Sequence, residues 1–187
     1  MMIDDPGFGS ALDDALPAVK RYARIESDAE DALVAELANA AARTAEAFLG
    51  LALVQRSFAE TLYPGADWRR LSRTPVTAIT TVEGLDLAGA PVALPVDGHA
   101  IDIDADGDGW VRVTQPDGAT RIRVHYVAGL ASEWSALPET IRQGVIRLAT
   151  HLHRHRDAAD DRGPPVAVAA LLRPWRRMPF GLARHRA

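Results

Sequence analysis

Residues 27–50, SDAEDALVAELANAAARTAEAFLG, are the longest part of the chain that follows a single structural period. Ser27 to Glu30 has the spacing of a capping box, a frequent start of a helix. Gly50 follows the last apolar residue, and glycine is the residue that most often ends a helix. The pattern predicts a long helix over about 28–49. Its predicted inward stripe contains Leu33, Leu37, Ala41, Thr44, Ala45 and Phe48.

Two more helices are predicted, over 15–25 and 138–156, and between them the pattern changes to that of strands. The predicted strands cover residues 54–62, 78–83, 92–94, 100–103, 110–114 and 120–127. We therefore expect an α+β fold. It would be a helical bundle of a short N-terminal helix, a long second helix and a C-terminal helix, with an inserted small antiparallel β region and an extended C-terminal arm.

The composition excludes several classes of function. The 187-residue chain contains no cysteine, which excludes disulfides, cysteine-bound metals and thiol catalysis. Its start is acidic, unlike a secretory signal, and its apolar runs are too short to span a bilayer. No glycine-rich nucleotide-binding motif and no nucleophile motif is present. We therefore predict a soluble protein that is not an enzyme and needs no cofactor.

Charge is unevenly distributed along the chain, whose formal net charge is −4. Residues 1–50 carry ten acidic and four basic residues, whereas residues 173–187 carry five arginines and no acid. A polar linker, DAADDRG, precedes the last predicted helix. We expect one domain over 1–163, with its β region at about 54–128, and a C-terminal docking helix and basic arm over 164–187.

An acidic stretch at residues 102–110, DIDADGDGW, resembles the start of an EF-hand calcium loop. Asp104, Asp106 and Asp108 occupy the first three ligand positions. Position 9 is a cation, and position 12 is Gln115, which cannot supply the bidentate carboxylate. The flanking segments are also predicted strands rather than helices. These observations favour a hairpin turn and leave the three aspartates as weak metal candidates.

The predicted helix over 138–156 contains three closely spaced histidines, a pattern that resembles a metal-binding site: His151, His153 and His155. At helical spacing, however, His153 points nearly opposite to His151. The three rings cannot share one ion, and we interpret them as structural.

The segment PPVAVAALLRPWRRM, residues 164–178, joins a small apolar helix to arginines and a tryptophan. From charge alone, a solvated terminus is an equal alternative. Tryptophan and arginine are frequent interface anchors, and arginines also suit nucleic-acid phosphates. The net negative charge of the chain favours a protein partner over nucleic acid. The predicted docking residues are Pro165, Val168, Leu171, Leu172, Arg173, Trp175, Arg176 and Arg177.

Besides the order of the predicted helices and strands along the chain, three short sequences are informative: VAG at 127–129, LPETIRQ at 137–143 and LLRPWRR at 171–177. Together they resemble the head–tail connector, or adaptor, proteins of tailed phages and of phage-derived gene transfer agents. The resemblance runs from about Ala15 to Met178, and the chain continues nine residues further, beyond the end of many relatives.

The resemblance implies a structural virion protein at the head–tail junction, assembled in the host cytoplasm. Such proteins form a ring, usually of twelve copies, that binds the portal protein by a C-terminal segment. A stopper or other tail-side neck protein binds the ring, and double-stranded DNA passes through it without sequence-specific contact; no membrane is involved. The resemblance gives no role to the acids Asp97, Asp102, Asp104, Asp106 and Asp108, which could face the bore, the tail or the solvent.

Two alternatives stay open at this point. The protein could be another neck component, such as a stopper or a tail-terminator-like protein, or a calcium-binding interaction module. Removing everything after Gly163 is expected to leave a folded protein that no longer assembles with portal.

Overall fold

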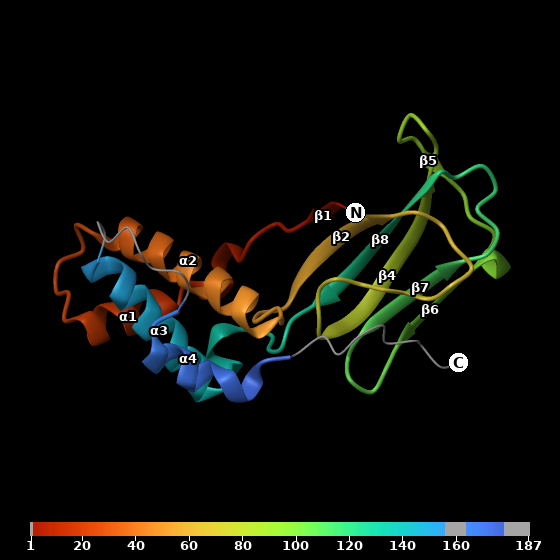
Figure 1. Ribbon diagram of the computed structural model, residues 1–187. Helices are drawn as coiled ribbons and strands as arrows, with labels where there is room; N and C mark the ends of the chain where they lie inside the picture. The colour runs from red at the N-terminus through yellow and green to blue at the C-terminus, as the bar shows by residue number, and fades with distance from the viewer. Residues whose placement is uncertain (1, 156–163, 178–187) are drawn as a thin grey trace. The chain divides into compact units, whose positions relative to one another are not determined.

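The computed structural model describes residues 2–155 and 164–177. These residues form two compact units, and each unit is assembled from separate stretches of the chain (Figure 1). The first, here called the β unit, contains residues 2–7 and 55–129. The second, the helical unit, contains residues 8–54, 130–155 and 164–177. Both units therefore depend on contacts between segments that lie far apart in the sequence.

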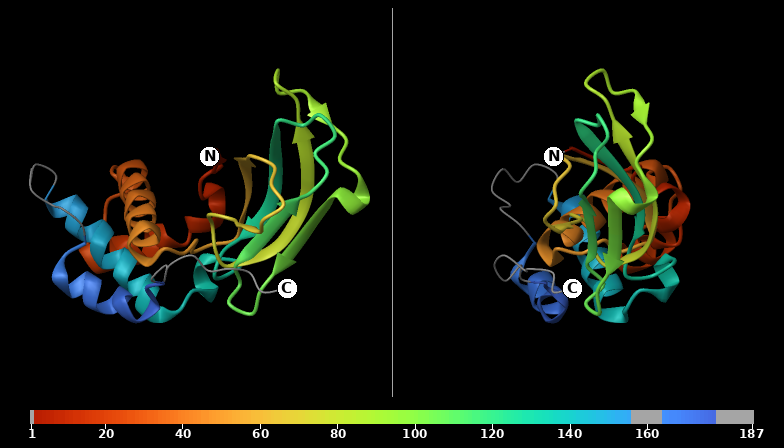
Figure 2. Two further views of the ribbon diagram at one scale, coloured as in Figure 1. Left: turned by 45° about the vertical axis from the view of Figure 1, so that its right-hand side comes forward. Right: turned by 90° about the vertical axis from the view of Figure 1, so that its right-hand side faces the viewer.

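The larger sheet of the β unit has five antiparallel strands in the order β1–β2–β8–β4–β5. β8 pairs along its length with β2 and β4, and the register shifts twice along β4. Such irregularities bend a strand, and Figure 2 shows the sheet curled. The strands are β1 (Met2–Asp4), β2 (Arg56–Leu62), β8 (Arg121–Ala128), β4 (Val76–Leu85) and β5 (Pro91–Val92).

The smaller sheet has three antiparallel strands, β3 (Arg69–Arg70), β7 (Gly109–Val113) and β6 (His99–Ile103), in that order. β6 and β7 are joined by the acidic turn at 104–108, so the predicted hairpin is confirmed. A Cβ at Gly109 would lie 2.9 Å from side-chain atoms of Leu71 and Val76. The glycine therefore allows β7 to approach the rest of the core closely.

Alternating burial along β8 defines the core of the β unit. Ile122, Val124 and Tyr126 are buried, while the residues between them are half-buried. The ring of Tyr126 stacks on that of Phe58 from β2, with 5.7 Å between the centroids. This two-residue period is the pattern that predicted the strand from the sequence.

A carboxylate lies inside this core. Glu60 of β2 is fully buried, and it accepts hydrogen bonds from the backbone N–H of Ser72 at 2.9 Å and from the Ser72 hydroxyl at 2.7 Å. The Tyr126 hydroxyl donates a third bond at 3.0 Å. Burial, together with the nearby Glu60 carboxylate, raises the pKa of Tyr126, so its hydroxyl keeps the proton that it donates.

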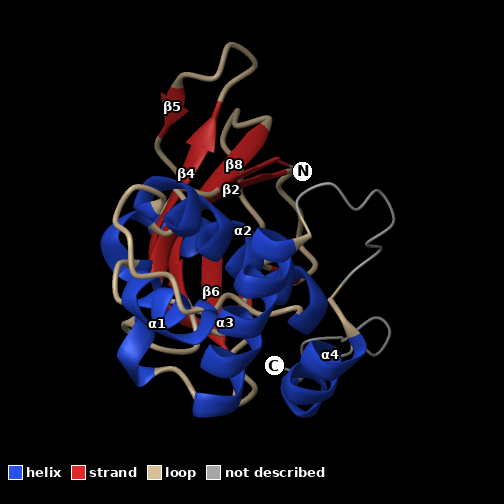
Figure 3. Ribbon diagram, turned by 90° about the vertical axis from the view of Figure 1, so that its left-hand side faces the viewer, coloured by secondary structure: helices blue, strands red, loops and turns tan. Residues whose placement is uncertain are grey.

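The helical unit contains α1 (Ala15–Ala23), α2 (Asp31–Leu49), α3 (Glu139–Arg154) and α4 (Val166–Leu172), drawn in blue in Figure 3. α3 contacts each of the other three helices. The residues that are completely buried between them include Val34, Ala41, Leu49, Ile141 and Val145. Burial of this apolar surface, rather than helix propensity, is the main source of stability for such short helices.

α2 begins at Asp31, three residues later than predicted. The Ser27 hydroxyl accepts a bond from the backbone two residues on, at 3.1 Å, and the Glu30 carboxylate lies 3.2 Å from Nε2 of His153, so the capping box is not formed. The end is as predicted, because Gly50 has a φ of 69°. The predicted inward stripe is correct only at Ala41 and Ala45, since the other four predicted residues are half-buried. Alanines occur on every side of this helix, so the sequence pattern does not determine which side is buried. The stripe consists of Val34, Ala38, Ala41, Ala42, Ala45, Glu46 and Leu49.

The predicted helical bundle with a small inserted β region is wrong. The described residues form four α-helices and two antiparallel sheets, a sheet-rich α+β fold whose larger sheet is a curled half-barrel. The strand period located most strands, but the size of a sheet depends on pairing between distant segments. The small apolar helix expected at the start of the C-terminal segment is present as α4, whereas the first residues of the expected arm, Arg173–Trp175, form a 3₁₀ turn rather than an extended chain. The last part of the predicted arm, 178–187, lies outside the described residues.

Candidate interaction surface

The C-terminal segment packs into the helical unit through one face of α4. Val168 and Leu172 are buried on that face, four positions apart, as the helical period requires. Leu172 lies against α3 at Gly144, where an added Cβ would come within 2.7 Å of the leucine Cδ2. The absence of a side chain at Gly144 thus lets the two helices approach closely at this point.

Three contacts hold the residues that follow α4. The indole N–H of Trp175 donates to the Thr140 hydroxyl at 2.9 Å. The Arg176 guanidinium lies over the Phe48 ring, 5.1 Å from its centroid, in the position of a cation–π contact. The backbone N–H of Arg177 donates to the last carbonyl of α2 at 2.8 Å, which satisfies a group left without a partner by the helix end.

The eight predicted docking residues divide by exposure. Val168 and Leu172 face the protein's own core, while Pro165, Leu171 and Arg177 are half-buried. We define the outer face of the segment as its exposed residues. It contains three of the eight predicted docking residues and four residues that were not predicted. The sequence did not reveal them because α4 is apolar all round, and its packing against α3 and α2 selects the buried side. The outer face consists of Val166, Ala167, Ala170, Arg173, Pro174, Trp175 and Arg176.

The acidic turn is held by its own carboxylates. Asp104 accepts bonds from the backbone N–H groups of Asp106 at 3.0 Å and Asp108 at 2.8 Å. Its second oxygen accepts from the indole of Trp110 at 2.8 Å. This is the usual way in which an aspartate stabilises a turn through nearby backbone groups.

Asp108 faces the neighbouring strand rather than the turn. Its carboxylate pairs with the Arg70 guanidinium at 2.9 Å and accepts from the Thr74 hydroxyl at 2.8 Å. The carboxylates of Asp104 and Asp108 therefore contact different partners instead of converging on one point. Among the described residues, no group of three or more histidine or carboxylate side chains is arranged to hold a metal ion.

The histidines of α3 also point in different directions. The rings of His151 and His155 stack with 4.3 Å between their centroids. His153 instead faces Glu30 near the start of α2. This arrangement agrees with the interpretation that the three rings do not share an ion.

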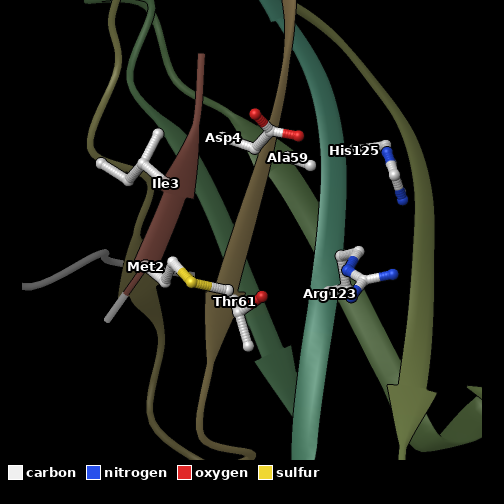
Figure 4. A pocket seen from close by; sticks show the side chains of 7 residues that line it. All are labelled: Met2, Ile3, Asp4, Ala59, Thr61, Arg123 and His125. Carbon is white, nitrogen blue, oxygen red and sulfur yellow. The ribbon is translucent and has the colours of Figure 1, made fainter. Parts of the chain in front are cut away.

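The β unit has a hollow of about 410 Å³ on the polar side of its larger sheet. Figure 4 shows its side chains in two rows across β1, β2 and β8, as the strand register requires. Arg123 and His125 both lie 3.4 Å from the Glu83 carboxylate, so the charge of Arg123 at the hollow is balanced from β4. The hollow is lined by Met2, Ile3, Asp4, Ala59, Thr61, Arg123 and His125.

Hydropathy gives one further result. None of the helices within residues 2–155 and 164–177 is both long enough and apolar enough to cross a membrane.

Comparison with known proteins gives matches only among solved structures, because no family model and no curated protein sequence matches the chain. A chain from the neck of an empty gene transfer agent (GTA) particle, with C6 symmetry, is 26% identical with a TM-score of 0.74. That match covers 99% of this chain and 100% of the other.

Two other matches come from native particles. A chain of the virion of a native gene transfer agent is 27% identical, with a TM-score of 0.72, and the match covers 96% of this chain and 97% of that one. A chain of the neck of a native particle, with C12 symmetry, is 26% identical with a TM-score of 0.68, covering 99% and 100%. The chain is thus similar over nearly its whole length to chains from the necks and the virion of gene transfer agent particles, which confirms the predicted virion location.

Proposed function

We propose that the protein is a non-enzymatic adaptor of the virion neck. Copies of it form a ring beneath the portal, joining the DNA-filled capsid to the tail side of the neck. The observation that carries this proposal is the match to a neck chain over 99% of this chain and 100% of that one, with a TM-score of 0.74. The C12 symmetry of one matched neck supports a ring of twelve.

The outer face of the C-terminal segment is the surface we assign to portal binding. Its buried side is fixed by Leu172 at Gly144, so the exposed side chains are held in place before a partner arrives. Arg173, Trp175 and Arg176 supply two cations and an aromatic ring, the residue types that most often anchor protein interfaces. A rigid anchor loses less conformational entropy on binding than a disordered one.

Electron microscopy of the protein with the portal oligomer of the same particle tests this proposal. We expect a ring seated directly on portal. Arg173→Glu and Trp175→Ala should each weaken portal binding at least about tenfold, whereas Arg147→Ala, which removes an exposed arginine elsewhere in the helical unit, should not.

Thermal unfolding of each variant separates lost binding from lost folding. Binding only to a pre-assembled neck, and not to portal alone, would contradict the adaptor assignment and favour a stopper. Normal portal binding by a folded Arg173→Glu, Trp175→Ala double variant would contradict the role of the outer face.

A further inference from the structure

β6 is an edge strand whose apolar side continues the core of its sheet. Ile101 of β6 lies opposite Val111 of β7, on the same face. Val111 is completely buried, but Ile101 is 47% exposed and Ile103 is 38% exposed. The buried apolar face of the sheet therefore extends past the last strand onto side chains that the described residues leave half uncovered.

The backbone of β6 offers a second observation. Among residues 2–155 and 164–177, β6 pairs with β7 alone, and Figure 1 shows it at the margin of the sheet. The N–H of Asp104 donates toward β7 at 3.0 Å, and in an antiparallel ladder this direction alternates along the strand. The N–H and C=O groups of Ile101 and Ile103 thus point away from β7. Edge strands are commonly protected by proline or by charged side chains, especially lysine. β6 has no proline or lysine, and its one charged side chain, Asp102, alternates with Ile101 and Ile103 and so lies on the other face of the strand.

The two edges of this sheet differ in charge. Beside β6 lie Asp97, Asp102 and Asp106. The opposite edge is β3, where Arg69 is exposed. An exposed arginine on one edge and several acids beside the other suit contacts between copies that all point the same way, and such contacts close into a ring.

We propose that β6 of one copy joins the β3 edge of the next copy in the ring, so that Ile101 and Ile103 become covered. This inference rests on the proposed ring function and adds to it the surface through which neighbouring copies meet. The occupant is a second copy of this chain because the matched necks have sixfold and twelvefold symmetry and because the exposed Arg69 can meet the acids beside β6 of a neighbouring copy.

Cysteine cross-linking tests the inference directly, since the chain contains no cysteine. Arg69→Cys would be combined in turn with His99→Cys, Ile101→Cys and Ile103→Cys, which covers the registers that place position 69 opposite a residue on the Ile101 face of β6. Within one copy, position 69 lies opposite 111 and 111 opposite 101, so 69 and 101 are two strand spacings apart, about 10 Å. A disulfide needs Cα atoms within about 7 Å, so these pairs can cross-link only between copies.

Rings formed on the portal oligomer would be oxidised and separated under denaturing, non-reducing conditions. We expect at least one pair to give a ladder in steps of 20.2 kDa, lost on reduction. The single variants should give no ladder, and neither should Arg69→Cys with Leu87→Cys, whose second site is 85% exposed and lies between β4 and β5 of the larger sheet.

The outcomes separate the two proposals. If the wild-type protein forms no ring on portal, the proposed function fails and this inference falls with it. If rings form but none of the three pairs gives a ladder, the adaptor function stands and the β6–β3 interface is overturned.

Discussion

The contact between Leu172 and Gly144 provides a quantitative test of whether the C-terminal segment belongs to the helical core. Leu172 is completely buried. Leu172→Ala is expected to lower the free energy of unfolding by about 3 kcal/mol, the middle of the range for buried leucines. For a protein of this length, about 1 kcal/mol shifts Tm by about 2–4 °C, so Tm should fall by about 6–12 °C.

Gly144→Ala combines two opposing effects. Replacing a glycine inside a helix stabilises it by about 1 kcal/mol through helix propensity. The new Cβ would, however, lie 2.7 Å from Cδ2 and 3.1 Å from Cγ of Leu172, and overpacking of this kind costs about 1–3 kcal/mol. Since Cδ2 is the end of a flexible side chain, part of the clash can relax. We expect a net loss of about 1 kcal/mol.

The double variant tests whether positions 144 and 172 are in direct contact. With alanine at 172 the clash disappears, so Gly144→Ala should recover its propensity gain of about 1 kcal/mol. The double variant should then be about 2 kcal/mol less stable than wild type, compared with about 4 kcal/mol if the two effects simply added. Urea unfolding followed by tryptophan fluorescence measures all four proteins. Additivity within about 0.5 kcal/mol would refute the contact. Val166→Ala, on the outer face, is the control and should change stability by less than about 0.5 kcal/mol.

Three further predictions concern charged groups. Glu60→Gln should destabilise the protein by at least about 2 kcal/mol in urea unfolding, because a buried carboxylate that accepts three bonds is replaced by a neutral amide. Hydrogen bonding to Lys20 lowers the pKa of Asp28, and the same bond raises the pKa of Lys20. The pair therefore stabilises at neutral pH and loses its effect as pH falls through the lowered pKa of Asp28, so Lys20→Gln should reduce the acid sensitivity of Tm. Because Asp104 already accepts bonds from its own turn, calcium at 1 mM should not raise Tm; a rise that Asp104→Asn abolishes would restore the calcium-module reading.

The sequence located those elements that carry a clear period. The alternation in β8 and the helical spacing in α3 are visible in the residues themselves. β1 and β3 were missed because three and two residues are too few to show a period; they are strands because β2 and β7 lie beside them. The same limit explains the wrong fold class, since the pairing of β8 with both β2 and β4 creates the curled sheet.

The candidate surfaces could be predicted only in part from the sequence, because the exposure of their residues also depends on distant segments. The sequence marked α4 and the arginines after it, but the choice of buried face depends on Gly144, a residue of another helix. Likewise, residues 100–103 were predicted as a strand, yet the position of β6 at a sheet edge follows from the order β3–β7–β6. The exposure of a side chain depends on which other segments pack against it, and a local sequence pattern does not contain that information.

The proposed portal-binding surface lies in the helical unit, and the proposed contact between neighbouring copies lies in the β unit. Variants of the two surfaces should therefore fail at different steps of assembly. Truncation after Gly163 would remove Val168 and Leu172 from the helical core, so loss of portal binding in that variant would not separate unfolding from a lost contact. Outer-face variants keep the buried side of α4 and should fail at recruitment to portal. A charge placed at Ile101 in the β unit should instead allow single copies to reach portal but prevent a closed ring, because a ring needs every copy to contact two neighbours. If both kinds of variant failed at the same step, portal binding and lateral contact would depend on one surface, and the assignment of separate surfaces would be wrong.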